Sequence, residues 1–296
     1  MALQDIFITG SSGKIGSHIT ASLLAEGHSL RLLCRSESDA MIKHSRVRYV
    51  FGDLLDRASY ASALEGCGLV LHAGGITHTN DESKYYDINS KSTLGLLEAC
   101  NEHRVRRFIF ISTRAIDEGG GAYSRSKAIA EKHVKASGID WVILRLGEVY
   151  GIYDNIGAID MLLKNIRRLP FAPVIGDGSL TLAPIHISDV VLAVTRVVND
   201  NEIRNTLYNI TGPESLTYNE LLDIILAKEG KKIRIYLPLS VVGAVLKALA
   251  FISKNGPVAT DQLPRLMSQK SDDISLAKKD FGFNPAKFSS MMAKHG

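Results

Sequence analysis

The stretch TGSSGKIG at residues 9–16 decides the fold of this chain. It follows a short, apolar, β-rich run at residues 3–9 and precedes a helical pattern, so it forms a turn between a strand and a helix. Gly10 allows the tight turn, Gly13 lets the backbone approach an anion, and Gly16 lets the helix pack closely on the strand. Free N–H groups and the helix dipole favour negative charge there. The stretch predicts a loop that binds a pyrophosphate; the alternative is a glycine-rich turn needed only for packing.

Strands and helices alternate along the first half of the chain. Five further short apolar runs are typical of strands, at residues 29–34, 47–51, 69–72, 108–111 and 141–144. Helical patterns lie between them, at about residues 56–65, 82–104 and 122–137. The apolar runs are continuous, as strands buried on both faces require. This order predicts an α/β fold, with a Rossmann doubly wound parallel sheet covered by helices on both faces.

The regular alternation of strands and helices ends after about residue 151. A helix near 157–169, a Pro- and Gly-rich stretch at 170–178, a helix near 188–199, a strand at 207–210 and a mostly helical tail from 217 follow in turn. We therefore expect two domains. The Rossmann dinucleotide-binding domain comprises residues 1–155 with 185–212, and a smaller, mostly helical C-terminal substrate lobe comprises 156–184 with 213–296.

The most apolar segment lies at residues 237–252. It is interrupted by Pro238, Ser240 and Lys247 and falls short of the ~20 residues that a transmembrane helix needs. It is therefore expected to be a buried or half-buried helix of the lobe, with peripheral membrane contact as the alternative.

Composition excludes several classes of protein. The chain has 296 residues, of which 45% are hydrophobic and 22% charged, which is ordinary globular composition. A net charge of +4 is weak over this length and argues against a nucleic-acid binder. The three cysteines lack CxxC spacing, so neither a disulfide framework nor a metal site is expected. A reduced, cytoplasmic setting without a signal peptide is the simplest expectation.

The end of the second strand bears on the choice of dinucleotide. NAD sites usually carry an acidic residue there, which binds the ribose 2′-hydroxyl. Here the strand ends in Arg35 and Ser36 instead, and these could bind a 2′-phosphate. NADP is therefore favoured over NAD. In the alternative interpretation, Arg35 is solvated or stacks on adenine.

A tyrosine and a lysine suggest acid–base chemistry. Tyr123 and Lys127 are four residues apart at the start of the helix predicted over 122–137, so they share one helix face. A free tyrosine has a pKa of about 10, and a nearby ammonium lowers it toward usable acid–base chemistry. The pair follows the fifth strand, which ends at Ser112 and Thr113.

Together these motifs resemble the short-chain dehydrogenase/reductase superfamily, specifically its extended branch of nucleotide-sugar epimerases, dehydratases and reductases. The resemblance covers nearly the whole chain and also includes Val149-Tyr150-Gly151 and the Gly176-Asp177-Gly178 turn followed by His186. It implies cofactor contacts from residues in the loop and at strand ends: Gly10, Ser12, Gly13, Lys14, Ile15, Gly16, Arg35, Ser36, Asp53, Leu54, Ala73, Gly74, Gly75, Asn89, Ser112, Tyr123 and Lys127.

The resemblance also implies a mechanism of hydride transfer at a carbinol or carbonyl carbon. Tyr123 would exchange a proton with the substrate oxygen, and Thr113 would hydrogen-bond that oxygen. Lys127 would hold the nicotinamide ribose and keep the pKa of the tyrosine low. Simpler roles stay open, since Thr113 could cap the strand end, Asn89 could be structural and Asp53 could cap a helix.

The sequence departs from the family at several positions. Glu148 stands where the family often has an Asn that contacts the diphosphate of the sugar nucleotide, and Leu182 stands where it often has Arg. Lys164, Arg167 or Arg168 would then bind the nucleotide, or these three residues form a solvated helix face. Arg114 follows Thr113, where dehydratases carry an acidic pair. The connection from there to Tyr123 is short and Gly-rich, which predicts a mobile rim and a more open pocket.

The leading hypothesis is an NAD(P)-dependent oxidoreductase or epimerase acting on a hydroxyl or keto carbon of a nucleotide sugar. The alternatives are an NADP-dependent reductase or dehydrogenase of a non-sugar ketone or alcohol, and a non-catalytic dinucleotide-binding subunit. The sequence does not separate an epimerase from a reductase. By analogy with the family, the helices at 82–104 and 122–137 would pair in a homodimer.

Overall fold

A seven-stranded parallel sheet forms the centre of the computed structural model, which describes residues 3–37, 42–117, 119–152, 157–230, 232–244, 267 and 271–294. The strands lie in the order β11-β6-β5-β4-β1-β2-β3. Their bounds are β1 Asp5–Thr9, β2 Ser29–Cys34, β3 Val47–Phe51, β4 Leu69–His72, β5 Arg107–Thr113, β6 Asp140–Leu146 and β11 Thr206–Ile210. The order reverses between β1 and β4, and such a switch point opens a crevice at the carboxyl ends of the strands. The predicted Rossmann sheet is confirmed.

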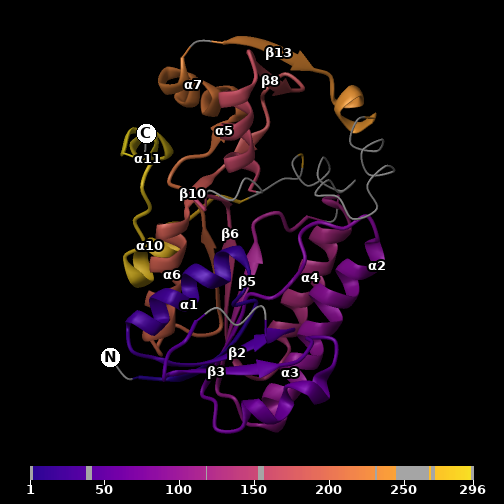
Figure 1. Ribbon diagram of the computed structural model, residues 1–296, viewed down its shortest axis with the longest axis vertical. Coiled ribbons are helices and arrows are strands. Elements are labelled where there is room, and N and C mark those ends of the chain that lie inside the picture. Colours follow the sequence, from indigo (N-terminus) through magenta and orange to yellow (C-terminus); the bar gives the residue numbers. More distant parts are fainter. Residues whose placement is uncertain are drawn as a thin grey trace.

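Helices cover both faces of this sheet (Figure 1). On one face lie α1 (Lys14–Ala25), α6 (Ile187–Asn199) and α10 (Ser275–Phe281), and their apolar residues share a core with Ile6 and Ile8 of β1. On the other face lie α3 (Ser92–Glu102) and α4 (Gly121–Lys135), which pack around Phe7. Successive side chains of a strand point to opposite faces, so β1 contributes to both cores.

Two predicted helices have a different form. The pattern at 56–65 forms two 3₁₀ turns, η2 (Arg57–Ser59) and η3 (Ala61–Leu64), and the Ser59 hydroxyl donates to the Asp56 carbonyl in the first of them. The pattern at 82–104 divides into α2 (Glu82–Tyr85), the π-helical segment η4 (Tyr86–Lys91) and α3. Such π segments often occur at functional sites.

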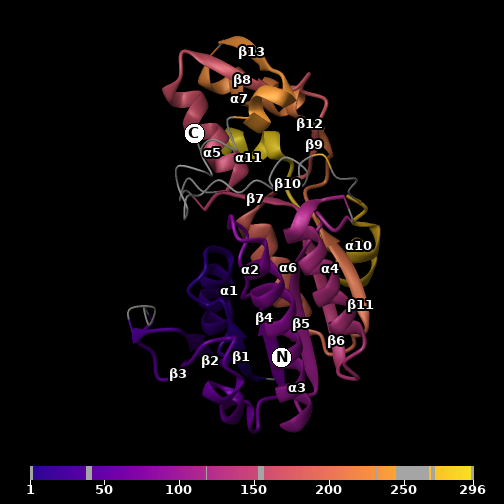
Figure 2. The same ribbon diagram turned by 90° about the vertical axis from the view of Figure 1, so that its right-hand side faces the viewer.

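A second group of elements lies beyond the carboxyl ends of the strands (Figure 2). It contains α5 (Ala158–Arg168), α7 (Tyr218–Glu229) and α11 (Phe288–Lys294), which share a third apolar core. Three two-stranded sheets accompany them: β7 (Glu148–Tyr150) with β10 (Pro184–His186), β9 (Thr181–Leu182) with β12 (Leu216–Thr217), and β8 (Phe171–Ile175) with β13 (Ile233–Leu237). We call this group the lobe. The domain boundaries expected from the sequence stay a prediction.

Strands β8 and β13 are absent from the sequence-based description. The first lies in the stretch described as Pro- and Gly-rich, and the second lies in the tail expected to be mostly helical. Of the apolar segment 237–252, residues 239–244 are helical, and its remainder from 245 lies outside the described residues. Among the described residues, no helix has the length and apolar character needed to cross a bilayer.

Candidate active site

The glycine loop is built for close backbone approach. Gly10 has φ of 73°, and a Cβ there would lie 2.6 Å from the Gly74 nitrogen at the end of β4. A Cβ on Gly16 would lie 2.0 Å from the Gly10 carbonyl oxygen. Gly13 caps α1 without a side chain, and Ser12 and Lys14 beside it are exposed. Helix α1 thus begins beside exposed residues, a position that suits the pyrophosphate of a dinucleotide.

The second and third strands end beside this loop. Arg35 and Ser36 are exposed directly after β2, whose last residue, Cys34, has its sulfur 3.8 Å from the Ser11 hydroxyl. After β3, an Asp53 carboxylate oxygen accepts the Leu55 N–H at 2.8 Å and shapes the turn there. The side chain of Leu54 lies 2.7 Å from where a Cβ of Gly74 would stand. These contacts place Asp53 and Leu54 at the same end of the sheet as the loop.

A buried histidine ties β1 to β4. The Thr93 hydroxyl donates to the Asn89 carbonyl at 2.8 Å, so its oxygen accepts from His72 Nε2–H at 2.9 Å. His72 Nδ1 is then the acceptor for the Thr9 hydroxyl at 2.6 Å, and the Thr9 oxygen accepts the Gly74 N–H at 3.1 Å. Burial, with the Lys127 charge nearby, lowers the pKa of His72 to about 3. The neutral imidazole thus holds the Thr9 hydroxyl, which in turn fixes the Gly74 backbone.

Asn89, in the π segment η4, links two parts of the site. Its amide holds both backbone groups of Ile76, donating to the carbonyl at 3.0 Å and accepting from the N–H at 2.8 Å. The same amide nitrogen donates to Ser126 Oγ at 3.2 Å, and that hydroxyl donates to the Tyr123 carbonyl at 2.8 Å. Asn89 therefore connects the segment after β4, which includes Ala73 and the exposed Gly75, to helix α4.

Tyr123 and Lys127 lie on the buried face of α4, exposed by 9% and 6%. The Tyr123 ring packs edge-on against Tyr85, with 5.8 Å between centroids. Lys127 Nζ donates to the Ile111 carbonyl of β5 at 2.9 Å. From Lys127 back to Tyr123 is about 6 Å along a helix, and from Ile111 on to Thr113 is about 7 Å along a strand. The Lys127 bond thus ties α4 to β5 within one helical turn of Tyr123.

The lysine has an unusual protonation equilibrium. Its amine lies 3.9 Å from the centroid of the Phe110 ring and is almost wholly removed from water. Burial lowers the pKa of Lys127 to about 7, although the Glu131 carboxylate acts in the opposite direction. The amine therefore loses its proton near neutral pH. The sequence analysis assumed an ammonium at this position.

Ser112 and Thr113 have different surroundings. The Ser112 hydroxyl donates to Glu131 at 2.6 Å, and this carboxylate also binds the Arg145 guanidinium at 2.9 and 2.6 Å. The Thr113 hydroxyl oxygen accepts the Ala115 N–H at 3.1 Å, in the turn that leaves β5. Thr113 is half-buried. Ser112 thus anchors α4 to the sheet, and Thr113 lies at the edge of the crevice.

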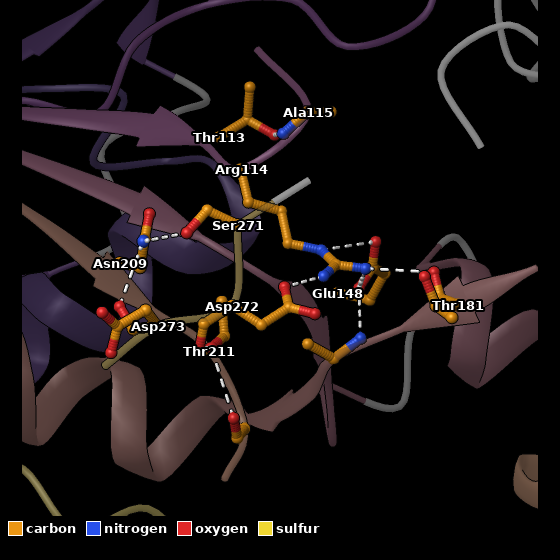
Figure 3. Close-up of polar contacts among 12 residues, drawn as sticks. Thr113, Arg114, Ala115, Glu148, Thr181, Asn209, Thr211, Ser271, Asp272 and Asp273 are labelled. Carbon is orange, nitrogen blue, oxygen red and sulfur yellow. Dashed lines mark hydrogen bonds and ion pairs between the residues drawn. The ribbon is translucent and has the colours of Figure 1, made fainter. Parts of the chain in front are cut away.

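Glu148 and Leu182 do not form an anion site. Glu148 forms a bidentate ion pair with Arg114, at 3.2 and 3.0 Å, and also accepts the Ala183 N–H at 2.9 Å (Figure 3). Leu182 is 5% exposed and belongs to the apolar core of the lobe. Sequence reasoning gave Arg114 no part in the site. A cation directly after the strand end, with an unexplained acid at 148, was the available signal.

The three cations of α5 lie elsewhere in the lobe. Lys164, Arg167 and Arg168 line a cavity of about 290 Å³ together with Tyr150, His186 and residues of α11. Arg167 pairs with Glu229 at 2.8 Å. None of the cofactor-site residues expected from the sequence lines this cavity.

Known proteins match either the first half of the chain or most of its length. The family described as NAD(P)H-binding matches residues 10–155. The sterol-4-alpha-carboxylate 3-dehydrogenase (decarboxylating) of Dictyostelium discoideum is 25% identical, over 85% of each chain. An uncharacterized UDP-glucose epimerase of Bacillus subtilis is 27% identical, over 85% of this chain and 90% of its own. The chain spans only 28% of the length of three longer mycobacterial relatives.

Among solved structures, UDP-glucuronic acid 4-epimerase of Bacillus cereus, in complex with UDP-glucuronic acid and NAD, matches with a TM-score of 0.76. It is 22% identical, over 98% of this chain and 96% of its own. A parallel sheet with a glycine loop at its switch point defines a dinucleotide-binding protein of the Rossmann type. More narrowly, the chain is similar over most of its length to dehydrogenases and epimerases of the extended short-chain dehydrogenase/reductase type. The two relatives are named for dehydrogenase and epimerase activities.

Proposed function

We propose that the protein is an NAD(P)-dependent oxidoreductase or epimerase that acts by hydride transfer at a hydroxyl or keto carbon, and that Tyr123, Thr113 and Lys127 carry out its proton chemistry. The observation that carries the proposal is the packing of α4 on β5, in which Lys127 Nζ bonds the Ile111 carbonyl one turn away from Tyr123. Tyr123 Oη gives a proton to the substrate oxygen in reduction and takes it back in oxidation. Thr113 Oγ1 donates a hydrogen bond to the same oxygen and orients it.

A nicotinamide dinucleotide supplies the hydride chemistry when bound. The loop from Gly10 to Gly16 would hold its pyrophosphate, and Lys127 would bind a ribose hydroxyl. We propose NADP as the preferred dinucleotide, because the exposed Arg35 follows β2 where an acid would favour NAD. Arg35 presents a planar, permanently charged fork that suits a 2′-phosphate.

The first proposed substrate class is a nucleotide sugar. It is supported by the fold shared with an epimerase solved with UDP-glucuronic acid. A second class, a non-sugar ketone or alcohol, is favoured by two observations. Arg114 already neutralises the Glu148 carboxylate, and Leu182 is buried, so neither residue offers a charge to a diphosphate. The dehydrogenase relative from Dictyostelium is named for a sterol substrate.

Turnover by matched variants tests the proposed role of Tyr123. Wild type, Tyr123→Phe and Tyr208→Phe are incubated with NADPH or NADP and a panel of UDP-, GDP- and dTDP-sugars, sterol ketones and simple ketones. Tyr208 is another buried tyrosine, and its hydroxyl donates to Asp280 at 2.7 Å in a different part of the fold. We expect Tyr123→Phe to lose about 100-fold or more in kcat and to bind cofactor normally, while Tyr208→Phe keeps its turnover. Equal turnover by Tyr123→Phe and wild type would remove Tyr123 from the mechanism.

Two further proposals concern the setting of the protein. The helices α3 and α4 would pair with those of a second copy in a homodimer, which light scattering of the purified protein tests. The three cysteines, Cys34, Cys67 and Cys100, are buried and form no disulfide bond, which supports a reduced, cytoplasmic location.

A further inference from the structure

A buried arginine directly follows Thr113, and its guanidinium joins three other segments (Figure 3). The Arg114 side chain is only 1% exposed. Nε and Nη2 donate to the two Glu148 oxygens of β7, Nη1 donates to the Asp272 carboxylate, and Nη2 also donates to the Thr181 carbonyl of β9 at 3.2 Å. One cation thus binds two carboxylates and a carbonyl that approach from different parts of the chain.

The cluster lies at the junction between the sheet and the lobe. On the sheet side, the Arg114 N–H donates to the Leu146 carbonyl of β6 at 2.9 Å. On the lobe side, Glu148 begins β7 and also accepts an N–H from the residue before β10. The Asp272 carbonyl accepts from Thr211 Oγ1 at 3.4 Å, just beyond β11. Arg114 therefore fixes the turn after β5 relative to elements on both sides of the crevice.

This turn also sets the direction of the Thr113 hydroxyl. The oxygen of that hydroxyl accepts the Ala115 N–H at 3.1 Å, and Arg114 is the residue between the two partners. A displacement of the Arg114 backbone would move the Ala115 N–H and release the hydroxyl to other rotamers. The guanidinium, held by ion pairs that are largely removed from water, opposes such a displacement.

We propose that Arg114 is a positioning residue that orients the Thr113 hydroxyl toward the reacting oxygen by clamping the end of β5 to the lobe. Its catalytic consequence rests on the proposed function of Thr113, whereas its effect on the turn does not. If the ion pairs of Arg114 contributed only to stability, weakening them would not change the orientation of the Thr113 hydroxyl. The turnover rate per folded molecule would also stay the same. The two roles therefore predict different measurements.

Arg114→Lys tests the proposal, since it keeps the charge and removes the planar fork. The matched control is Arg31→Lys. Arg31 binds Asp5 through Nε and Nη2 and two carbonyls through Nη1, at the opposite end of the sheet. The first measurement is residue-resolved hydrogen exchange of the Ala115 amide in the protein without substrate. We expect exchange at least about 10-fold faster in Arg114→Lys and unchanged in Arg31→Lys.

The second measurement is steady-state kinetics with the substrate that the panel identifies. We expect kcat of Arg114→Lys to fall by about 10- to 100-fold, with KM for the cofactor unchanged. In a Thr113→Ala background the same substitution should have almost no further effect, because the hydroxyl that it positions is gone. Fully additive losses, or unchanged Ala115 exchange, would overturn the proposal. If wild type turns over nothing on the panel, the proposed function fails and the exchange measurement still decides whether Arg114 orients the turn.

If Arg114→Lys does not fold, Glu148→Gln replaces it. The amide can still accept the Ala183 N–H but loses the charge that binds Nε and Nη2 of Arg114. We expect the same faster exchange at Ala115 with a smaller amplitude, and an unchanged rate would again count against the proposal.

Discussion

Replacing Lys127 by Met tests whether this amine is neutral in the folded, cofactor-free protein. Burial lowers the pKa of Lys127 from 10.5 to about 7. Each tenfold change in proton affinity corresponds to about 1.4 kcal/mol, so burying this side chain costs about 4 kcal/mol at pH 7 and about 2 kcal/mol at pH 9. Between pH 7 and 10.5 the unfolded chain binds the proton that the folded protein releases, so this contribution raises stability as pH rises.

The change between the two pH values is more informative than either free energy alone. Lys127→Met also removes the hydrogen bond to the Ile111 carbonyl, and that loss of about 1 kcal/mol is nearly the same at both pH values. We therefore expect the free energy of unfolding of wild type, relative to Lys127→Met, to rise by about 2 kcal/mol from pH 7 to pH 9.

Urea unfolding of both proteins without cofactor measures this difference. Lys132→Met serves as the control, because Lys132 is an exposed lysine on the same helix and its replacement should give no comparable pH dependence. A constant difference between wild type and Lys127→Met would refute the reasoning, since it would mean that the folded protein keeps the amine protonated over this range.

The remaining predictions concern the dinucleotide. Gly16→Ala should weaken NADPH binding by about 10-fold or more, measured by fluorescence titration, because the new Cβ meets the Gly10 carbonyl oxygen at 2.0 Å. Gly68→Ala, where nothing lies within 4 Å, should bind as wild type, and equal affinities for the two variants would contradict the packing argument. Wild type should bind NADPH more tightly than NADH, and Arg35→Gln should abolish that preference. Equal affinities in wild type would remove Arg35 from 2′-phosphate binding.

The parts of the fold that follow from local sequence were predictable. The continuous apolar runs of the buried strands and the glycine spacing at 10, 13 and 16 mark β1, its loop and α1, because each signal lies within a few residues of the element it specifies. The π segment was not predictable, because residues 86–91 are compatible with an ordinary helix. Asn89 of this segment bonds the backbone of Ile76, which belongs to another part of the chain, the segment after β4.

The candidate site divides in the same way. Tyr123 and Lys127 could be paired from their spacing on one helix. The ion pairs of Arg114 could not be predicted in this way, because Arg114 is separated from Glu148 by 34 residues and from Asp272 by 158. The lowered pKa of Lys127 likewise depends on its burial between α4 and β5, which the spacing of the pair does not specify.

The two halves of the site are therefore held in place by different parts of the fold. Thr113, Tyr123 and Lys127 are positioned by β5 and α4, whose backbones are fixed by the central sheet and its cores. Short paired strands of the lobe position Glu148 and Leu182. Arg114 is where the two halves meet, since its backbone pairs with β6 and its side chain binds the lobe. A substitution that alters the lobe near Glu148 would thus change the orientation of the Thr113 hydroxyl through the Arg114 guanidinium. With the proposed roles of Thr113 and Arg114, substrate specificity and catalytic geometry would be coupled at Arg114.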